Sequence, residues 1–170
     1  MVTLYIMSGL PFSGKSTLSR KISEQLKLPR ISFDEAWLEV EQKEGVVPGV
    51  NDVEQWMYIN KTCEERALQL LRDGHSVVYD NLGSEYKHRE KMRNIANEAE
   101  ASSKIVYLDV GKKEVNRRRE INLSSKERHQ VSDENFDKAL KTFEPPRENE
   151  ITIIYNPLQD MEAWIDTEFS

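Results

Sequence analysis

The sequence predicts a single α/β domain, residues 1–170, in which a parallel β-sheet is covered by helices on both faces. Short apolar runs alternate with longer segments whose apolar residues recur every three or four positions. The length of 170 residues and the hydrophobic content of 38% fit one domain with one core. The chain also contains no internal repeat and no linker, so nothing divides it.

Three strands and three helices are expected in the first half of the chain. Gly74 is suited to end the longest helix, and Asp34 precedes the second helix and could cap it. The expected elements are a strand Val2–Met7, a helix Ser16–Leu26, a strand Arg30–Phe33, a helix Glu35–Gln42, a loop Glu44–Val50, a long helix from Asn51 or Asp52, and a strand Ser76–Tyr79.

The second half continues the alternation of helices and strands. Ser132 is a suitable helix cap, and Pro145 and Pro146 end the helix that follows it. The expected elements are a helix from Ser84 to about Glu100, a strand Lys104–Asp109, a helix Glu114–Asn122, a loop Leu123–Gln130, a helix from Ser132, a strand Ile151–Tyr155, and a last helix after Pro157.

A phosphate-binding loop lies between the first expected strand and the first expected helix. Residues 9–16 match G-x-x-x-x-G-K-[ST] at every fixed position, in the strand–loop–helix context that the motif requires. Glycines let the backbone approach phosphate oxygens, and the N–H groups at the helix start attract anions. Lys15 is expected to reach the β- and γ-phosphates, and the Ser16 hydroxyl to bind Mg²⁺. The expected nucleotide-binding residues are Gly9, Leu10, Pro11, Phe12, Ser13, Gly14, Lys15, Ser16 and Thr17.

The charge distribution favours a bound polyphosphate over a long nucleic acid. The formal net charge is −6. Residues 112–128 contain seven basic and three acidic side chains, so this stretch carries +4 and the rest of the chain carries −10. A long duplex requires an extended basic surface, whereas local positive charge suits a nucleoside triphosphate.

Cysteine content and hydropathy favour the cytoplasm. Cys63 is the only cysteine, so an intrachain disulfide is impossible, as fits a reducing compartment. The apolar start, Met1 to Met7, lacks a charged n-region and a cleavage site, so no signal peptide is expected. No apolar run is long enough to span a membrane.

Two acidic residues follow expected strands, at the sheet edge where ligands of such folds bind. The carboxylate of Asp34 could accept the proton of an attacking hydroxyl group, and a helix cap is the other interpretation of this residue. Asp80 could hold Mg²⁺ directly or through water, and a turn residue is the other interpretation.

Basic side chains between residues 112 and 128 are candidates for offsetting the charge of a transferring phosphate. Consecutive helical residues point in different directions, so Arg117, Arg118 and Arg119 cannot all face one ligand. A solvated helix face is the other interpretation. We also interpret the basic run Lys87–Arg93 of an earlier helix first as a solvated face and second as a nucleic-acid contact.

Aromatic residues supply a hypothesis about the acceptor. Trp37, Trp56 and Tyr58 lie in the second and third expected helices. They either belong to the core or line an acceptor pocket between these helices. Cys63 falls on the apolar face of the long helix, and we expect it in the core.

Several segments together resemble the zeta-toxin and polynucleotide-kinase-like group of P-loop kinases, a neighbourhood that includes predicted kinases described as AAA domains. The resemblance extends from the start of the chain to about Glu150. The segments are Gly9–Thr17, Ile31–Asp34, Val77–Asn81, and Arg128–Val131 leading to Phe143–Pro146.

The resemblance implies a three-layer P-loop fold with five parallel strands in the order 2-3-1-4-5 and a lid at about residues 112–131. It also implies a role for each acidic residue: Asp34 is the general base, and Asp80 is the acid that holds magnesium. The implied lid residues are Arg117 or Arg118, together with Arg128.

The lid departs from the polynucleotide kinase pattern at one position. Where those kinases carry a second arginine four places after the first, this chain has Ile121 after Arg117 and Asn122 after Arg118. The departure weakens the resemblance to polynucleotide kinases in particular.

The sequence thus predicts an ATP- and Mg²⁺-dependent kinase that transfers the γ-phosphoryl group of ATP to a hydroxyl of a small molecule. A 5′-hydroxyl polynucleotide kinase is one alternative, and a nucleotide-dependent switch that transfers no phosphate is another. A GTPase is disfavoured, because D-x-x-G occurs at residues 80–83 but no N-K-x-D follows it. The acceptor and the oligomeric state are not specified by any pattern in the sequence.

Overall fold

The computed structural model describes residues 1–44, 53–125 and 132–170. In this part of the chain, five parallel strands form one sheet in the order β2-β3-β1-β4-β5, which confirms the implied order. The strands are β1 Thr3–Ser8, β2 Arg30–Ser32, β3 Val77–Asp80, β4 Ser102–Leu108 and β5 Thr152–Tyr155.

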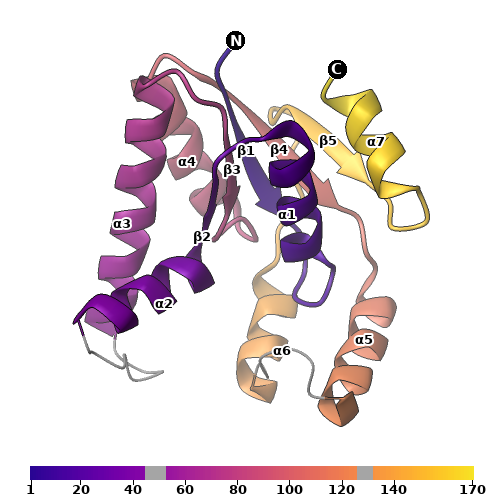
Figure 1. Cartoon of the computed structure of the whole chain (residues 1–170). Helices are drawn as coiled ribbons and strands as arrows, with labels where there is room; N and C mark the ends of the chain where they lie inside the picture. The colour runs from indigo at the N-terminus through magenta and orange to yellow at the C-terminus, as the bar shows by residue number, and fades with distance from the viewer. Residues whose placement is uncertain (45–52, 126–131) are drawn as a thin grey trace.

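Helices cover both faces of the sheet, as predicted. α1 and α7 lie on one face, α3 and α4 lie on the other, and α2, α5 and α6 lie at the end toward which the strands run (Figure 1). Within the described ranges, no helix is both long and apolar enough to cross a membrane. The helices are α1 Lys15–Leu26, α2 Phe33–Glu44, α3 Val53–Arg72, α4 Tyr86–Glu98, α5 Lys112–Ser125, α6 Asp133–Thr142 and α7 Met161–Glu168.

The central strand β1 contributes side chains to two cores. Leu4 and Ile6 pack on one side of the sheet with Cys63 of α3. Met7 packs on the other side with Leu18 of α1. Burial on both sides explains why the strands are continuous apolar runs rather than alternating ones. Cys63 is fully buried, as predicted, and burial raises the pKa of its thiol to about 11.

Some element boundaries differ from the prediction. α2 begins at Phe33, so Asp34 lies inside its first turn and is not its cap. α5 extends to Ser125, into the segment predicted as a loop, because a helix boundary without Gly or Pro leaves little signal. The predicted cap of α6 is confirmed, since the Ser132 hydroxyl accepts a hydrogen bond from the backbone N–H of Asn135 at 3.3 Å. The predicted start of the long helix lies outside the described residues.

The basic run of α4 contains one residue for which the prediction of a solvated face is wrong. Arg89 is fully buried and forms two hydrogen bonds of 2.9 Å with the carboxylate of Glu150. Its guanidinium also donates to the backbone carbonyls of Gly83 and Glu144, at 3.1 and 2.8 Å. This pair joins α4 to the segment between α6 and β5. Charge spacing alone does not reveal it, because the partner is 61 residues away.

The loop after β3 lies directly against the end of β1. The Ser8 hydroxyl donates to the carbonyl of Gly83 at 2.7 Å. A Cβ atom built on Gly83 would lie 2.0 Å from the carbonyl oxygen of Met7, so only glycine fits here. The glycine of the D-x-x-G match therefore has a packing role.

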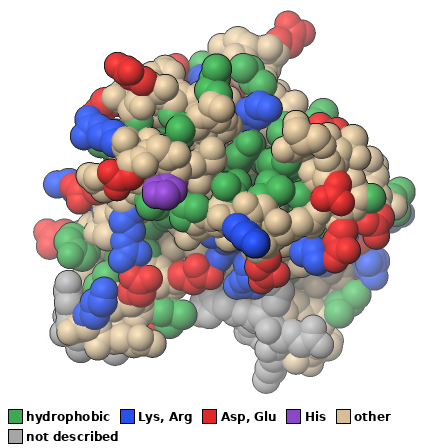
Figure 2. Space-filling view, turned by 45° about the horizontal axis from the view of Figure 1, so that its top comes forward, with side chains coloured by type: hydrophobic (Ala, Val, Ile, Leu, Met, Phe, Trp, Pro, Cys, Tyr) green, Lys and Arg blue, Asp and Glu red, His purple; other side chains and the backbone are tan. Residues whose placement is uncertain are grey.

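Acidic and basic side chains are interspersed over the face shown in Figure 2, with hydrophobic side chains between them. On the described part of that face, no single sign of charge forms an extended track of the kind that a long nucleic acid requires.

Candidate functional site

The phosphate loop has the backbone shape of an anion-binding nest. Gly9, Phe12 and Gly14 have φ angles of 153°, 62° and 102°, so left-handed residues interrupt the loop and turn its N–H groups inward. Gly14 caps α1 without a side-chain hydrogen bond, and the first turn contains no acidic residue. The buried Ser13 hydroxyl has no hydrogen-bond partner among the described residues. These features fit a bound phosphate group.

Lys15 lies at the start of α1, where the motif predicts it. Its ammonium donates to the carbonyls of Gly9 and Leu10 at 3.1 and 3.3 Å, which holds the positive charge against the loop. Ser16 follows it in the first turn of α1. The structure therefore brings the predicted cation and the predicted hydroxyl to one end of the loop.

Asp80 ends β3 and is almost fully buried. Its Oδ2 accepts hydrogen bonds from the Ser19 hydroxyl at 2.8 Å and from Arg30 at 2.6 Å. Arg30 also donates to Ser19 at 2.7 Å and forms an ion pair with Glu35. Sequence reasoning missed Arg30. The available signal is its charge at the first position of a strand that otherwise belongs to the core.

The carboxylate and hydroxyl oxygens near the phosphate loop suit Mg²⁺ better than a metal ion whose ligands all come from the protein. Carboxylate and hydroxyl oxygens are hard ligands, and Oδ1 of Asp80 accepts no hydrogen bond from any residue in the described ranges. Those ranges contain no group of three or more His, Cys, Asp or Glu that could hold a metal ion. Mg²⁺ usually keeps water and phosphate oxygens as ligands, so one carboxylate and the Ser16 hydroxyl suffice.

Asp34 lies in the first turn of α2, directly after β2. Ser32 of β2 is the register partner of Asp80, so Asp34 and Asp80 lie at the same edge of the sheet, as predicted. Asp34 is exposed, and no described residue forms a hydrogen bond or ion pair with its carboxylate. A negative charge in the first turn also stabilises the helix dipole, which is a structural role for the same residue.

The three adjacent arginines of α5 point in three directions, as predicted. Arg118 donates to the carbonyls of Phe12 and Ser13, at 3.3 and 2.9 Å, so its guanidinium lies against the phosphate loop. Arg117 is 61% exposed, and Glu114 is the residue that it binds within the part of the chain that the structure describes. Hydrogen bonds with Arg117 and Arg118 lower the pKa of the Glu114 carboxyl to about 2.

Arg119, the third, forms an ion pair with Asp133 and lies over the ring of Phe136, 4.6 Å from its centroid. Phe136 of α6 also packs edge-to-face on Phe12, with ring centroids 5.9 Å apart. Through Arg118 of α5 and Phe136 of α6, both helices therefore contact the phosphate loop. Arg128, the other predicted lid residue, lies outside the described residues.

Two cavities lie near the carboxyl ends of the strands. A cavity of about 230 Å³ lies between the phosphate loop and α5, and Phe12, Thr17, Arg118 and Asn122 line it. The other, of about 620 Å³, lies between α3 and α4.

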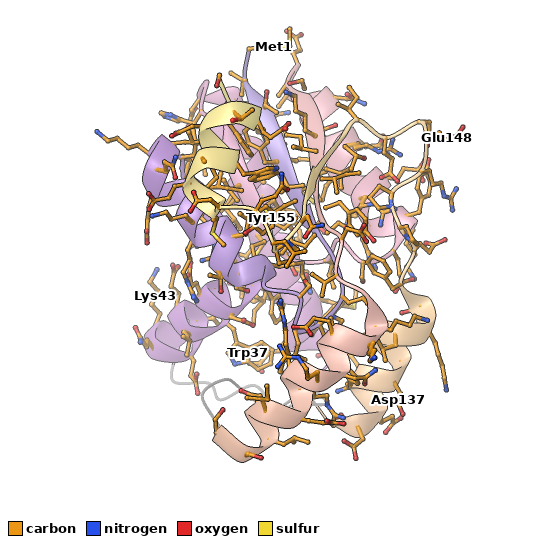
Figure 3. The ribbon with its side chains drawn as sticks, turned by 90° about the vertical axis from the view of Figure 1, so that its right-hand side faces the viewer. Met1, Trp37, Lys43, Asp137, Glu148 and Tyr155 are labelled. Carbon is orange, nitrogen blue, oxygen red and sulfur yellow. The ribbon has the colours of Figure 1, made fainter. Side chains whose placement is uncertain are left out.

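The hypothesis that Trp37, Trp56 and Tyr58 line a pocket is confirmed only in part by the cavity of about 620 Å³. Trp56 and Tyr58 line it, but it lies between α3 and α4 rather than between α2 and α3. Trp37 does not line it and packs instead on Phe33, with ring centroids 5.6 Å apart. Trp37 lies at the end of the molecule that holds α5 (Figure 3). The contribution of α4 was missed because no spacing links these helices.

Comparison with known proteins identifies relatives of this fold. Residues 4–146 match the family model described as AAA domain. A presumed kinase from Chloroflexus aurantiacus J-10-fl is 18% identical, with a TM-score of 0.75 over 98% of this chain and 93% of that one. The APS kinase CysC of Mycobacterium tuberculosis, solved with AMPPNP and APS, is 16% identical, with a TM-score of 0.69 over 99% and 95%.

A gluconokinase from Sinorhizobium meliloti 1021 is 19% identical, with a TM-score of 0.62 over 97% of this chain and 87% of that one. No curated protein matches the sequence. At these identities, the solved structures show a shared fold, and they include several kinases. The zeta-toxin part of the resemblance stays a prediction.

Proposed function

Since the chain belongs to the AAA domain family, we propose that it is an ATP- and Mg²⁺-dependent phosphotransferase that acts on a hydroxyl of a small molecule. The observation that carries this proposal is the contact of Arg118 with the Ser13 carbonyl at 2.9 Å. It brings a second cation, besides Lys15, to the phosphate loop at the sheet edge that also holds Asp34 and Asp80.

In the proposed mechanism, the loop N–H groups and Lys15 bind the phosphates of the nucleotide. Ser16 and Asp80 would hold Mg²⁺, and the ion would offset the charge of the β- and γ-phosphates. Arg30 and Ser19 keep the Asp80 carboxylate in place through its Oδ2. The cavity of about 230 Å³ beside Thr17 suits the rest of the nucleotide.

The transfer step exchanges one phosphorus–oxygen bond for another. The acceptor oxygen forms a bond to the γ-phosphorus, the bond to the β-phosphate oxygen breaks, and ADP leaves. Asp34 accepts the proton of the acceptor hydroxyl. Arg118 offsets the negative charge on the transferring group.

A small acceptor is favoured by the charge of the surface. The chain carries −10 outside residues 112–128, and acidic and basic side chains are interspersed over the face shown in Figure 2. A long anionic acceptor would be repelled by such a surface.

The test is transfer of labelled γ-phosphate from Mg·ATP to a panel of acceptors, with Asp34→Asn as the variant. The panel contains nucleosides, sugars, aminoglycosides, UDP-N-acetylglucosamine and a 5′-hydroxyl oligonucleotide. Loss of the base should lower the transfer rate by roughly 10²- to 10⁴-fold, while ATP binding stays unchanged. Asp73→Asn is the matched control, because it makes the same change at an exposed residue after the end of α3.

The outcomes separate the three hypotheses. Label on a small acceptor that is lost in Asp34→Asn supports the proposal. Label on the oligonucleotide, with a steep salt dependence, would favour the polynucleotide kinase. Tight ATP binding without transfer to any acceptor would favour the switch, and full transfer by Asp34→Asn would remove this residue from the mechanism.

A further inference from the structure

The cavity between α3 and α4 has the size and lining of a small-molecule site. Its volume of about 620 Å³ lies in the range of ligand pockets, about 300–1,000 Å³. Large apolar side chains supply most of its wall: Trp56 and Met57 from α3, Met92 from α4, Leu82 from the loop after β3, and Tyr79 from β3.

Tyr79 lines this cavity, and its hydroxyl group is able to donate a hydrogen bond. Tyr79 is only 2% exposed, and its hydroxyl oxygen accepts a hydrogen bond from Asn81 at 3.1 Å. The side-chain amide of Asn81 also donates to the side-chain Oδ1 of Asn60 at 2.9 Å. No residue in the described ranges accepts the hydroxyl hydrogen of Tyr79. Burial raises the pKa of this hydroxyl, so it stays protonated and able to donate.

His88 of α4 supplies a second polar group to the same cavity. Its Nδ1 is buried and has no hydrogen-bond partner among the described residues. Burial is the main cause that lowers the pKa of this imidazole, so the ring is neutral at pH 7. The cavity thus contains two neutral groups that can exchange hydrogen bonds with a ligand.

The cations that line the cavity are balanced by neighbouring carboxylates. Lys91 forms an ion pair with Glu64 at 2.6 Å, and Lys61 forms one with Glu65 at 3.6 Å. A pocket for a carboxylate or phosphate group needs charge that is not already paired. The lining therefore favours an uncharged ligand.

Trp56 gives the cavity a flat surface that is suited to stacking. The residue is 41% exposed, although its indole is one of the largest apolar groups of the chain. The ring of Trp56 also packs near the ring of Phe33, with centroids 6.3 Å apart. Phe33 directly precedes Asp34 in the sequence. Trp56 in the cavity wall therefore contacts the residue next to Asp34, which we assign as the general base.

We propose that this cavity holds the non-reacting part of the acceptor, and that this part is a flat, uncharged ring with polar atoms at its edge. The ring stacks on Trp56 and exchanges hydrogen bonds with Tyr79 and His88. This inference rests on the proposed function, since it names the substrate class of the same site.

Binding is tested on the full chain in the presence of saturating Mg·ADP, so that the probes do not enter the nucleotide site. The flat probes are adenosine, uridine and 3-(hydroxymethyl)pyridine, and the comparison probes are glucose and gluconate. Calorimetry should detect at least one flat probe binding to the wild type more tightly than either comparison probe.

Two variants and one matched control locate that binding. Tyr79→Phe removes only the hydroxyl and should weaken the flat probe about tenfold, as expected for a lost neutral hydrogen bond. Trp56→Leu removes the stacking surface and should weaken binding of the flat probe tenfold or more, as expected for loss of a stacked aromatic ring. Tyr155→Phe makes the same change at a buried tyrosine on β5, beside α7 (Figure 3), and should change nothing.

Several results would overturn the inference, and they are distinguishable from failure of the kinase proposal. Tighter binding of glucose or gluconate would contradict the flat ring, and so would equal effects of Tyr79→Phe and Tyr155→Phe. Phosphate transfer to a sugar at an unchanged rate in Tyr79→Phe would leave the kinase standing and remove the cavity from it. Tyr79-dependent binding of a probe that is never phosphorylated, while another acceptor is, would overturn the role of the cavity as acceptor site.

Discussion

Arg30 begins the short strand β2, and its guanidinium reaches the carboxylate that ends the neighbouring strand. It contacts Asp80 at 2.6 Å and Ser19 at 2.7 Å, and its side chain is almost fully buried. A group that fixes a metal-binding carboxylate acts on the metal without touching it. Arg30 is therefore a positioning residue for the proposed Mg²⁺ site.

Replacement of Arg30 should change the magnesium requirement. In Arg30→Met, we expect the half-saturating Mg²⁺ concentration for phosphate transfer to rise roughly ten- to hundredfold, since Asp80 loses the partner that orients it. Binding of nucleotide in EDTA should stay unchanged. Arg66→Met removes an exposed ion pair with Glu39 and serves as the control. An unchanged Mg²⁺ dependence in Arg30→Met would contradict the positioning role.

Arg117 and Arg118 form a matched pair of adjacent residues. Arg118→Ala should lower the rate of phosphate transfer by roughly a thousandfold, on the scale of arginines that offset phosphate charge in P-loop enzymes. Arg117→Ala should change it less than about threefold, because Arg117 is exposed and pairs with Glu114 rather than with the phosphate loop. Single-turnover transfer measures both. Equal damage from the two variants would show that overall charge, rather than the contact with Ser13, is what matters.

Single residues of the site were predictable where a local pattern defines them. Lys15 follows from the spacing of the phosphate loop, and Asp80 from its place at the end of an apolar strand. Arg30 and Phe136 were not predictable, because their partners are 50 and 124 residues away, and only the folded sheet brings these pairs together.

At the scale of elements, the buried ion pair of Arg89 with Glu150 joins α4 to the segment that leads into β5. Both side chains are completely buried, and their two hydrogen bonds are each 2.9 Å long. Glu150 also accepts a hydrogen bond from the backbone N–H of Arg147 at 2.8 Å. The segment between α6 and β5 is thus fixed to α4 both by the Glu150 side chain and by its backbone carbonyl at Glu144.

Removal of one partner of this pair should destabilise the fold. Arg89→Met leaves the Glu150 carboxylate buried without its partner, and the free energy of unfolding should fall by about 3–5 kcal/mol. The double variant Arg89→Met/Glu150→Leu should lose less than the sum of the single changes, because no buried charge remains. Urea unfolding measures all three, and Arg72→Met at an exposed pair is the control. Additive losses would show that the two side chains act independently.

Secondary structure was predictable where the periodicity is long. The alternation of apolar strands with amphipathic helices led to the parallel sheet, and the resemblance supplied the strand order. The start of α2 was misplaced because the chain passes from β2 into this helix without an intervening turn residue. The sequence left Trp56 open between the core and a pocket lining, because periodicity cannot distinguish a core from a cavity wall, and in the structure it lines the cavity between α3 and α4.

At the scale of the whole molecule, acid should destabilise the fold below about pH 4.5. Four carboxyl groups have pKa values below the ordinary 4.5. In Glu39 and Glu114 the main cause is a hydrogen bond with an arginine, and in Glu150 burial raises the pKa but hydrogen bonds from Arg89 and Arg147 outweigh it. In the fourth, Glu144, the main cause is a hydrogen bond from the backbone of Tyr86. The groups are Glu39, Glu114, Glu144 and Glu150.

The direction of this pH dependence follows from proton uptake. The unfolded chain binds these protons near pH 4.5, whereas the folded chain binds them at lower pH, down to about 2 for Glu114. The stabilisation is therefore complete above about pH 4.5 and is lost as the pH falls below it. Urea midpoints between pH 7 and 3 measure the effect, and Glu150→Gln should flatten the curve. A midpoint that is constant over this range would contradict it.

Gly83 has a consequence for how this protein could acquire new substrates. Gly83 has only a hydrogen atom where a side chain would begin, and this hydrogen faces the carbonyl oxygen of Met7. Any larger group at residue 83 would push the loop away from β1. On the other side of this loop, Leu82 lines the cavity that we assign to the acceptor. Substitutions at residue 82 can therefore reshape the acceptor pocket, while Gly83 keeps the loop after β3 packed against the end of β1, which leads into the phosphate loop. Two adjacent positions thus divide the loop into a part that is open to divergence and a part that is closed to it.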